Sequence, residues 1–230
     1  MAANGRCTLY GETLWISPYV FSSFVALHEK RIPFDVVEVG LATGAHLEAP
    51  YRDASLTARV PSLGHAGFTL AESSAIAEYL DEVFPPPTYA RLLPADVRDR
   101  ARARQLMAWL RSDLGALRDE RSTVTMFHRF RLRPLSPSAR RDVDKLTRVV
   151  EQLMPSTGGA LFGAWCLADS ELAFMLHRLI LTGEDVPERL RTYASSQWQR
   201  PSVRAFIDRP RPAIPDSYWS VSGTPRPEPA

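Results

Sequence analysis

The 230-residue sequence contains little cysteine and almost no lysine. Its two cysteines, Cys7 and Cys166, are too few for a disulfide framework or a thiolate metal site. The five histidines show no ligand spacing such as HExxH, so we expect no metal. No apolar run approaches the roughly 20 residues that span a bilayer, and the first residues lack the apolar core of a signal peptide. We therefore expect a cytoplasmic protein with no membrane segment.

A strong excess of one charge is also absent. The 28 basic and 26 acidic residues give a net charge of +2, whereas a nucleic-acid-binding face is usually strongly basic. The arginines between positions 98 and 104 are interleaved with Asp96 and Asp99, a pattern typical of a solvated helix face. We expect no nucleic-acid partner.

The first third of the chain predicts a small α/β domain. Residues 7–10 and 34–39 have the composition of strands, and a helix begins between them at Ser17-Pro18. Serine is a favoured N-cap, and proline fits the first helical position. A strand, a helix and a strand in so short a stretch predict two parallel strands joined by a right-handed crossover.

Residues 59–80 predict a hairpin that leads directly into a helix. The turn is expected at Gly64 to Gly67, and the first turn of the helix carries Glu72, Ser73 and Ser74. A helix N-terminus offers unpaired N–H groups with partial positive charge, and the strands offer extended backbone. This combination suits a small peptide-like anion.

The remainder of the chain has helical periodicity. Three prolines, at positions 85–87, mark a linker. We expect helices over residues 94–120, 136–154, 168–181, 186–194 and 201–207. Six prolines after residue 208 predict a poorly ordered tail. The expected division is an N-terminal domain at 1–84, a linker at 85–93, a helical domain at 94–208 and the tail at 209–230.

This organisation resembles that of the cytosolic glutathione S-transferase family. The resemblance covers about residues 6–208 and includes Val60-Pro61 and Glu72-Ser73. Further matching blocks, at residues 17–20, 72–80, 101–105, 108–114 and 197–200, resemble the bacterial YfcF-like branch. The resemblance implies an α/β thioredoxin-like N-terminal domain, an all-α C-terminal domain that lines the electrophile site, and a homodimer.

The resemblance also implies residues that bind glutathione as co-substrate. In the family the proline of the Val-Pro pair is cis, and the valine backbone bonds the cysteinyl part, which points to Val60 and Pro61. Glu72 corresponds to the residue that holds the γ-glutamyl ammonium and Ser73 to the one that holds its carboxylate; the alternative is that both only cap the helix. His46 falls where relatives place a polar side chain for the glycyl carboxylate, and is otherwise an exposed loop histidine.

Three side chains near the first strand are candidates for activating the thiol: Cys7, Tyr10 and Ser17. Cys7 is expected to pack inside the sheet, and the residues after Tyr10 do not match those of the tyrosine branches. Ser17 stands where serine branches carry their hydroxyl, so Ser17 is the catalytic candidate; the alternative is a pure N-cap role. Lowering a thiol pKa from about 8.5 to about 6.5 requires roughly 2.7 kcal/mol, which a hydrogen bond of about 1.5 to 3 kcal/mol can supply.

The expected activity is transfer of glutathione to a small hydrophobic electrophile, as in detoxification. With serine at position 17, mixed-disulfide chemistry is disfavoured. Peroxidase, dehalogenase and isomerase reactions stay open, as does a non-catalytic binding role. Arg111 or Asp113 could reach glutathione or a partner subunit. Asp169 is expected to be structural, with its capping box weakened because Cys166 replaces the family's Ser or Thr.

Overall fold

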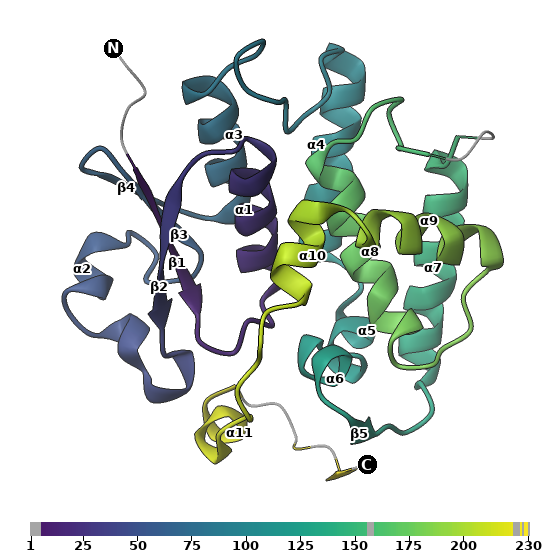
Figure 1. Cartoon of the computed structure of the whole chain (residues 1–230). Helices are drawn as coiled ribbons and strands as arrows, with labels where there is room; N and C mark the ends of the chain where they lie inside the picture. The colour runs from purple at the N-terminus through teal and green to yellow at the C-terminus, as the bar shows by residue number, and fades with distance from the viewer. Residues whose placement is uncertain (1–5, 156–158, 223–225, 227, 230) are drawn as a thin grey trace. The chain divides into compact units, whose positions relative to one another are not determined.

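The computed structural model describes residues 6–155, 159–222, 226 and 228–229. These residues form two units (Figure 1). The first comprises residues 6–92 and 201–222, and the second comprises residues 93–200 and the described residues after 225. The sequence groups residues 201–208 with the helical domain, whereas in the structure they pack on the first helix of the N-terminal unit.

The N-terminal unit is built on a four-stranded sheet with the order β2-β1-β3-β4. The strands are β1 (Cys7–Glu12), β2 (Phe34–Val39), β3 (Ser62–His65) and β4 (Phe68–Ala71). β1 is parallel to β2, as the predicted crossover requires, and antiparallel to β3. The hairpin turn lies at Ala66-Gly67, where φ is +51° and +80°, so Gly64 belongs to β3. Two positive φ angles in a two-residue loop are typical of a type I′ turn.

Helices complete this unit, and α1 is central among them. The bounds are α1 (Pro18–Glu29), α2 (Tyr51–Ala54), α3 (Ser73–Val83), α10 (Pro201–Ile207), α11 (Asp216–Ser222) and the 3₁₀ turns η1 (Leu41–Thr43) and η2 (Ala45–Leu47). α3 and α10 both pack on α1, and α11 packs on η1. The expected tail therefore contains a helix and lies against its own unit, while residues 223–225, 227 and 230 fall outside the described chain.

One of the two lysines, Lys30, connects the end of α1 to α3 and to the segment that follows α3. Its ammonium forms an ion pair with Asp81 at 2.8 Å and donates to the carbonyls of Phe84 (2.8 Å) and Ala90 (2.9 Å). The Lys30 side chain is fully buried. A buried ammonium is tolerated when it is paired and hydrogen-bonded, so the proline-rich stretch of this unit is held at a fixed place.

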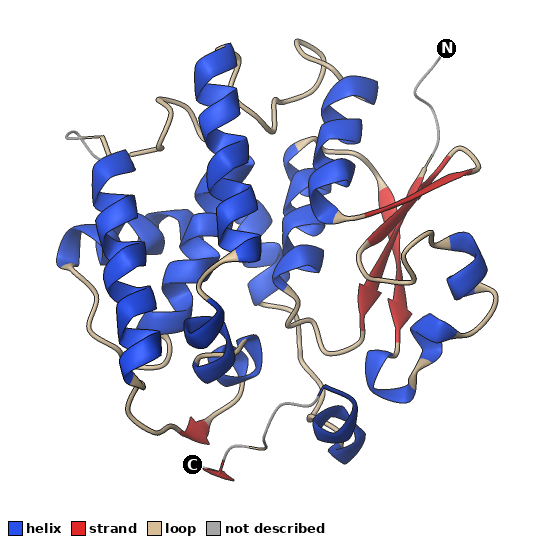
Figure 2. Ribbon diagram, turned by 180° about the vertical axis from the view of Figure 1, so that it is seen from behind, coloured by secondary structure: helices blue, strands red, loops and turns tan. Residues whose placement is uncertain are grey.

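The second unit is mainly helical (Figure 2). Its helices are α4 (Val97–Ser112), α5 (Gly115–Glu120), α6 (Thr123–Phe127), α7 (Pro137–Leu153), α8 (Leu167–Ile180) and α9 (Glu188–Trp198), with two-residue strands β5 (Phe130–Arg131) and β6 (Glu228–Pro229). α8 contacts α4, α6 and α9 and is buried along almost its whole length. This agrees with its apolar sequence.

The prediction of one long helix over residues 94–120 is wrong. Leu114 has a left-handed φ of +60° between α4 and α5, a conformation that an α-helix cannot contain. The Asp113 carboxylate accepts the Leu114 N–H at 2.7 Å and the Trp109 indole N–H at 2.7 Å, and forms an ion pair with Lys145. Asp113 therefore stabilises the break between the two helices.

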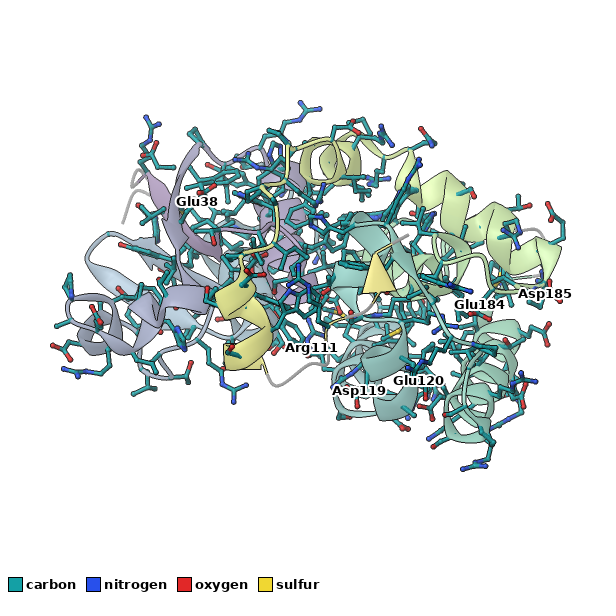
Figure 3. The ribbon with its side chains drawn as sticks, turned by 90° about the horizontal axis from the view of Figure 1, so that it is seen from below. Glu38, Arg111, Asp119, Glu120, Glu184 and Asp185 are labelled. Atoms are coloured by element: carbon teal, nitrogen blue, oxygen red, sulfur yellow. The ribbon has the colours of Figure 1, made fainter. Side chains whose placement is uncertain are left out.

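Two arginines of this unit, Arg111 and Arg121, form ion pairs within it; Arg111 and Glu184 are labelled in Figure 3. The Arg111 guanidinium donates to Glu171 at 2.6 Å and to the Met107 carbonyl at 2.8 Å. Arg121 donates to Glu184 at 2.7 Å. Arg111 and Asp113 are thus both engaged in contacts within their own unit.

Asp169 has a structural role at the start of α8. Its carboxylate accepts the N–H groups of Cys166 (2.9 Å) and Leu161 (2.8 Å) and the hydroxyl of Tyr193 (2.8 Å). Both halves of the capping box are present, with the Cys166 thiol facing the Asp169 N–H. The expected structural role is borne out by these contacts, and the thiol occupies the place of a hydroxyl.

Replacing Cys166 by serine is expected to raise the free energy of unfolding by about 0.5 to 1 kcal/mol, because a hydroxyl accepts a hydrogen bond better than a thiol. Denaturant unfolding of the purified variant measures the change. Cys7→Ser is the matched control: Cys7 is fully buried in β1 and has no capping role, so the same substitution there is expected to destabilise by roughly 1 to 3 kcal/mol. Equal shifts for both variants would contradict the capping argument.

His177 makes the stability of the helical unit depend on pH. Its ring stacks on Trp198 with centroids 3.7 Å apart, and burial lowers the pKa of His177 to about 4. An unfolded chain binds the proton near pH 6.5, so stability is full above 6.5 and falls as pH drops towards 4, by roughly 3 kcal/mol. Unfolding curves between pH 7 and 4 should show this loss, and His177→Phe should remove most of it. An unchanged pH slope in that variant would exclude His177 as the cause.

Candidate active site

The strand register brings four connecting segments to one end of the sheet. Tyr10 in β1 pairs with Ser62 in β3, Ser62 pairs with Ala71 in β4, and Glu12 pairs with Val39 in β2. The last residues of β1, β2 and β4 and the first residue of β3 therefore lie at the same end of the sheet (Figure 1). The chain segments that carry Ser17, His46, Val60 and Ser73 all begin or end there.

Ser17 is the N-cap of α1 and half-buried. Its Oγ accepts the N–H groups of Tyr19 and Val20, both at 3.3 Å, and Pro18 occupies the first helical position. Within the described chain the hydroxyl has no acceptor of its own. Because Oγ accepts from the helix, the hydroxyl proton remains for donation to another group. A cap role and a donor role are thus compatible in this geometry.

The loop before Ser17 is organised by Glu12, which the sequence analysis missed. The Glu12 carboxylate is buried and accepts the N–H groups of Leu14 (2.6 Å), Ile16 (2.6 Å) and Ser17 (2.8 Å). Burial raises the pKa of Glu12, while these backbone hydrogen bonds lower it. An acidic residue at the end of a strand gives no sequence signal for such a role, because the role depends on how the loop folds back.

Trp15, in the same loop, has a φ of +53°. This conformation costs on the order of 1 to 3 kcal/mol for a bulky residue and persists only where its surroundings impose it. The indole N–H donates to Glu38 of β2 at 2.7 Å, and Glu38 is labelled in Figure 3. The ring packs edge-on against Phe24 and Phe206. Trp15 is therefore a buried anchor of the loop and not part of an open substrate surface.

Val60 precedes β3 and offers free backbone groups. The Val60–Pro61 peptide bond is cis, which confirms the expected conformation. Among the residues that the structure describes, neither the N–H nor the C=O of half-buried Val60 has a hydrogen-bond partner. These groups can therefore pair with the backbone of a bound peptide.

A hydroxyl network that the sequence did not reveal supports the Val60 segment. The Tyr51 hydroxyl donates to the Arg59 carbonyl at 2.6 Å and lies 3.0 Å from Ser62 Oγ. Ser62 Oγ is also 3.0 Å from Ser55 Oγ. Burial raises the pKa of Tyr51, so its phenol stays protonated. The network fixes the carbonyl that directly precedes Val60.

Glu72 and Ser73 lie at the start of α3. Glu72 occupies the N-cap position, but its exposed side chain makes no capping hydrogen bond, and its φ is +71°. Capping alone therefore does not explain Glu72. Ser73 is buried at the first helical position, where the helix N-terminus favours an anion.

His46 lies in η2, in the connection between β2 and β3. The residue is half-buried, and its Nδ1 is buried without a hydrogen-bond partner in the described part of the chain. His46 is therefore not simply an exposed loop residue. A ligand that contacts its imidazole must do so elsewhere on the ring, because the protein covers Nδ1.

The other thiol and phenol candidates are less suited to act on a bound thiol. Cys7 is fully buried, and burial raises its pKa to about 11, so it stays a neutral thiol. Tyr10 lies within β1, with its ring 5.6 Å from that of Tyr51. Of the three candidates near the first strand, only Ser17 stands at a helix N-terminus.

No group of three His, Cys, Asp or Glu side chains among the described residues could hold a metal ion. None of the helices in the described ranges has the length and apolar character to cross a membrane.

Known proteins share both halves of this architecture. The model of the glutathione S-transferase N-terminal domain matches residues 16–83, and that of the C-terminal domain matches residues 96–210. A solved glutathione transferase homolog from Burkholderia gl BGR1, with bound glutathione, is 41% identical; the match covers 88% of this chain and 97% of that chain, with a TM-score of 0.74. A glutathione S-transferase structure from Rhodospirillum rubrum F11, at 24% identity and a TM-score of 0.68, covers 94% and 99% and shows the fold alone.

Curated relatives match over shorter stretches. A probable glutathione S-transferase of Oryza sativa subsp. japonica is 35% identical over 112 residues, which are 48% of this chain and 46% of the relative. A maleylpyruvate isomerase of Ralstonia sp is 33% identical over 97 residues, 42% of this chain and 44% of the relative. The chain spans about half the length of these curated relatives. On the two domain models and the Burkholderia structure, the chain belongs to the glutathione S-transferase family.

Proposed function

We propose that the protein binds glutathione at this end of the sheet, near Ser17, and transfers it to an electrophilic small molecule. The observation that carries the proposal is Ser17, whose Oγ accepts two helix N–H groups and keeps its proton for donation. That proton stabilises the glutathione thiolate, and the thiolate attacks the electrophile. We also propose that the protein belongs to the bacterial YfcF-like branch of the family and that it forms a homodimer.

Four residues of the protein each contact a different part of the glutathione tripeptide. The unpaired Val60 backbone holds the cysteinyl part, in the segment fixed by Tyr51. Ser73 and the N-terminus of α3 hold the γ-glutamyl carboxylate, and exposed Glu72 meets the ammonium. The half-buried imidazole of His46 meets the glycyl carboxylate. Each anchor supplies charge or hydrogen bonds complementary to one part of glutathione.

Calorimetric titration of the protein with glutathione tests the proposal. We expect saturable binding, together with the ultraviolet absorbance band of a thiolate at a pH where free glutathione is mostly protonated. Turnover is then measured with an activated aryl chloride, which gives a thioether and chloride, and with an organic hydroperoxide, which gives an alcohol and glutathione disulfide. Binding without turnover of any electrophile would favour the non-catalytic alternative. No binding would contradict the proposal.

A second candidate activity is glutathione-dependent isomerisation, favoured by the similarity to the Ralstonia maleylpyruvate isomerase. The thiolate would add to a conjugated double bond, the resulting single bond would rotate, and elimination would release the isomer and the thiolate. Glutathione is then regenerated, whereas conjugation consumes it. Assay of free thiol during turnover of a cis-configured unsaturated diacid separates the two activities.

A further inference from the structure

The loop between β1 and α1 is held from the C-terminal segment as well as from Glu12. The Arg211 guanidinium donates from Nε to the Trp15 carbonyl at 3.0 Å, across 196 residues of sequence. Its Nη1 donates to the carbonyls of Ile207 (2.7 Å) and Arg209 (3.1 Å). One side chain thus joins the end of α10 to the residue two positions before Ser17.

The neighbouring Arg209 also contacts Trp15. Its guanidinium carbon lies 3.7 Å from the centroid of the Trp15 ring, within the range of a cation–π contact. The Trp15 backbone is therefore held by Arg211 and its ring by Arg209, while φ at Trp15 is +53°. The two long-range contacts hold Trp15 in its strained backbone conformation. Such strain persists only where the surrounding structure imposes it, and it is often found at functional sites.

The charges around this contact are complementary. Burial lowers the pKa of Arg211 to about 10, and the nearby Glu12 carboxylate raises it, so the guanidinium stays charged at neutral pH. Glu12 itself accepts the Ser17 N–H at 2.8 Å. Asp208 adds a second negative charge near Arg211, and Arg209 a positive one.

We propose that Arg211 is a positioning residue for the thiolate-stabilising hydroxyl of Ser17. Arg211 fixes the Trp15 carbonyl, Glu12 fixes the N–H groups of Ile16 and Ser17, and together they set the direction of Ser17 Oγ. The planar guanidinium reaches carbonyls on two segments at once, which the single ammonium of lysine does less well. This role rests on the proposed function, because it matters only if Ser17 acts on a bound thiol.

The test compares Arg211→Gln with the wild-type protein by the pH profile of kcat, with glutathione saturating. In the variant we expect the pKa of the bound thiol to rise and kcat at pH 6.5 to fall about 5- to 10-fold, while glutathione affinity changes less than twofold. Hydrogen exchange of the Leu14, Ile16 and Ser17 amides should accelerate. Arg211→Lys is expected to restore part of the rate.

Arg6→Gln is the matched control. Arg6 directly precedes β1 in the same unit and pairs with Asp35 at the surface. Its kcat profile is expected to match wild type. If Arg211→Gln exchanges faster in the loop but keeps the wild-type pH profile, Arg211 is merely structural and the inference is wrong. If the wild-type protein does not bind glutathione, the proposed function fails and the positioning role fails with it.

Discussion

At pH 6.5, Ser17→Ala is expected to turn over an electrophile roughly 10- to 100-fold more slowly than the wild-type protein. The variant lacks a hydroxyl hydrogen bond to a charged sulfur, which contributes about 1.5 to 3 kcal/mol. The pKa of bound glutathione should therefore rise by about 1 to 2 pH units. The deficit should shrink above about pH 9, where the thiol ionises without help. Glutathione affinity should change little, because Ser17 is not among its proposed anchors.

Helix capping must be separated from catalysis, because Ser17→Ala also removes an N-cap worth about 1 kcal/mol. Ser136 offers a matched control: it caps α7 in the same Ser-Pro arrangement, and its Oγ accepts the Ala139 N–H at 3.2 Å. Ser136→Ala should lower stability but leave the thiol pKa unchanged. Ser17→Thr should keep both roles. Wild-type turnover by Ser17→Ala at pH 6.5 would exclude Ser17 as the stabilising group.

Glu72→Gly should weaken glutathione binding and strengthen the fold at the same time. Loss of the carboxylate removes a charge-assisted contact to the ammonium, worth about 1.5 to 3 kcal/mol, so Kd should rise roughly 10- to 100-fold. Glycine also relieves the φ of +71° at this position, which should raise the free energy of unfolding by up to about 1 kcal/mol. Calorimetry measures the first effect and denaturant unfolding the second.

Two further variants separate the loss of glutathione affinity from the gain in stability. Glu72→Gln keeps a side chain at the same φ, so it should lose affinity without gaining stability. Ala66→Gly relieves another positive φ, of +51°, in the exposed hairpin turn, and should gain stability without losing affinity. A Kd for Glu72→Gln equal to that of the wild-type protein would remove the ammonium-binding role.

Local signals were sufficient to predict much of the N-terminal fold. Ser17-Pro18 marks the start of α1 because capping chemistry is local. The hairpin before α3 follows from strand composition and turn residues, although the turn occupies only Ala66-Gly67 of the expected range Gly64 to Gly67. The break at Leu114 carried a weaker signal, the glycine that follows it, and helical periodicity on both sides concealed it.

Long-range contacts explain what the sequence could not show. Arg211 meets Trp15 across 196 residues, and no pattern around either residue indicates that contact. Glu12 and Tyr51 act through backbone groups, so residue type alone does not reveal their partners. The proline content of the last residues indicated weak order, yet α11 packs on η1. The candidate anchors were found by family resemblance, whereas their supports became visible only in three dimensions.

The burial of Lys30 has a practical consequence for chemical labelling. The chain has two lysines; the Lys145 side chain is 42% exposed, whereas that of Lys30 is fully buried. An amine-acylating reagent should therefore modify the Lys145 side-chain amine, in its deprotonated form, in the native protein and reach Lys30 only when the N-terminal unit opens. Peptide mass spectrometry of Lys30 acylation would therefore report how often the N-terminal unit unfolds.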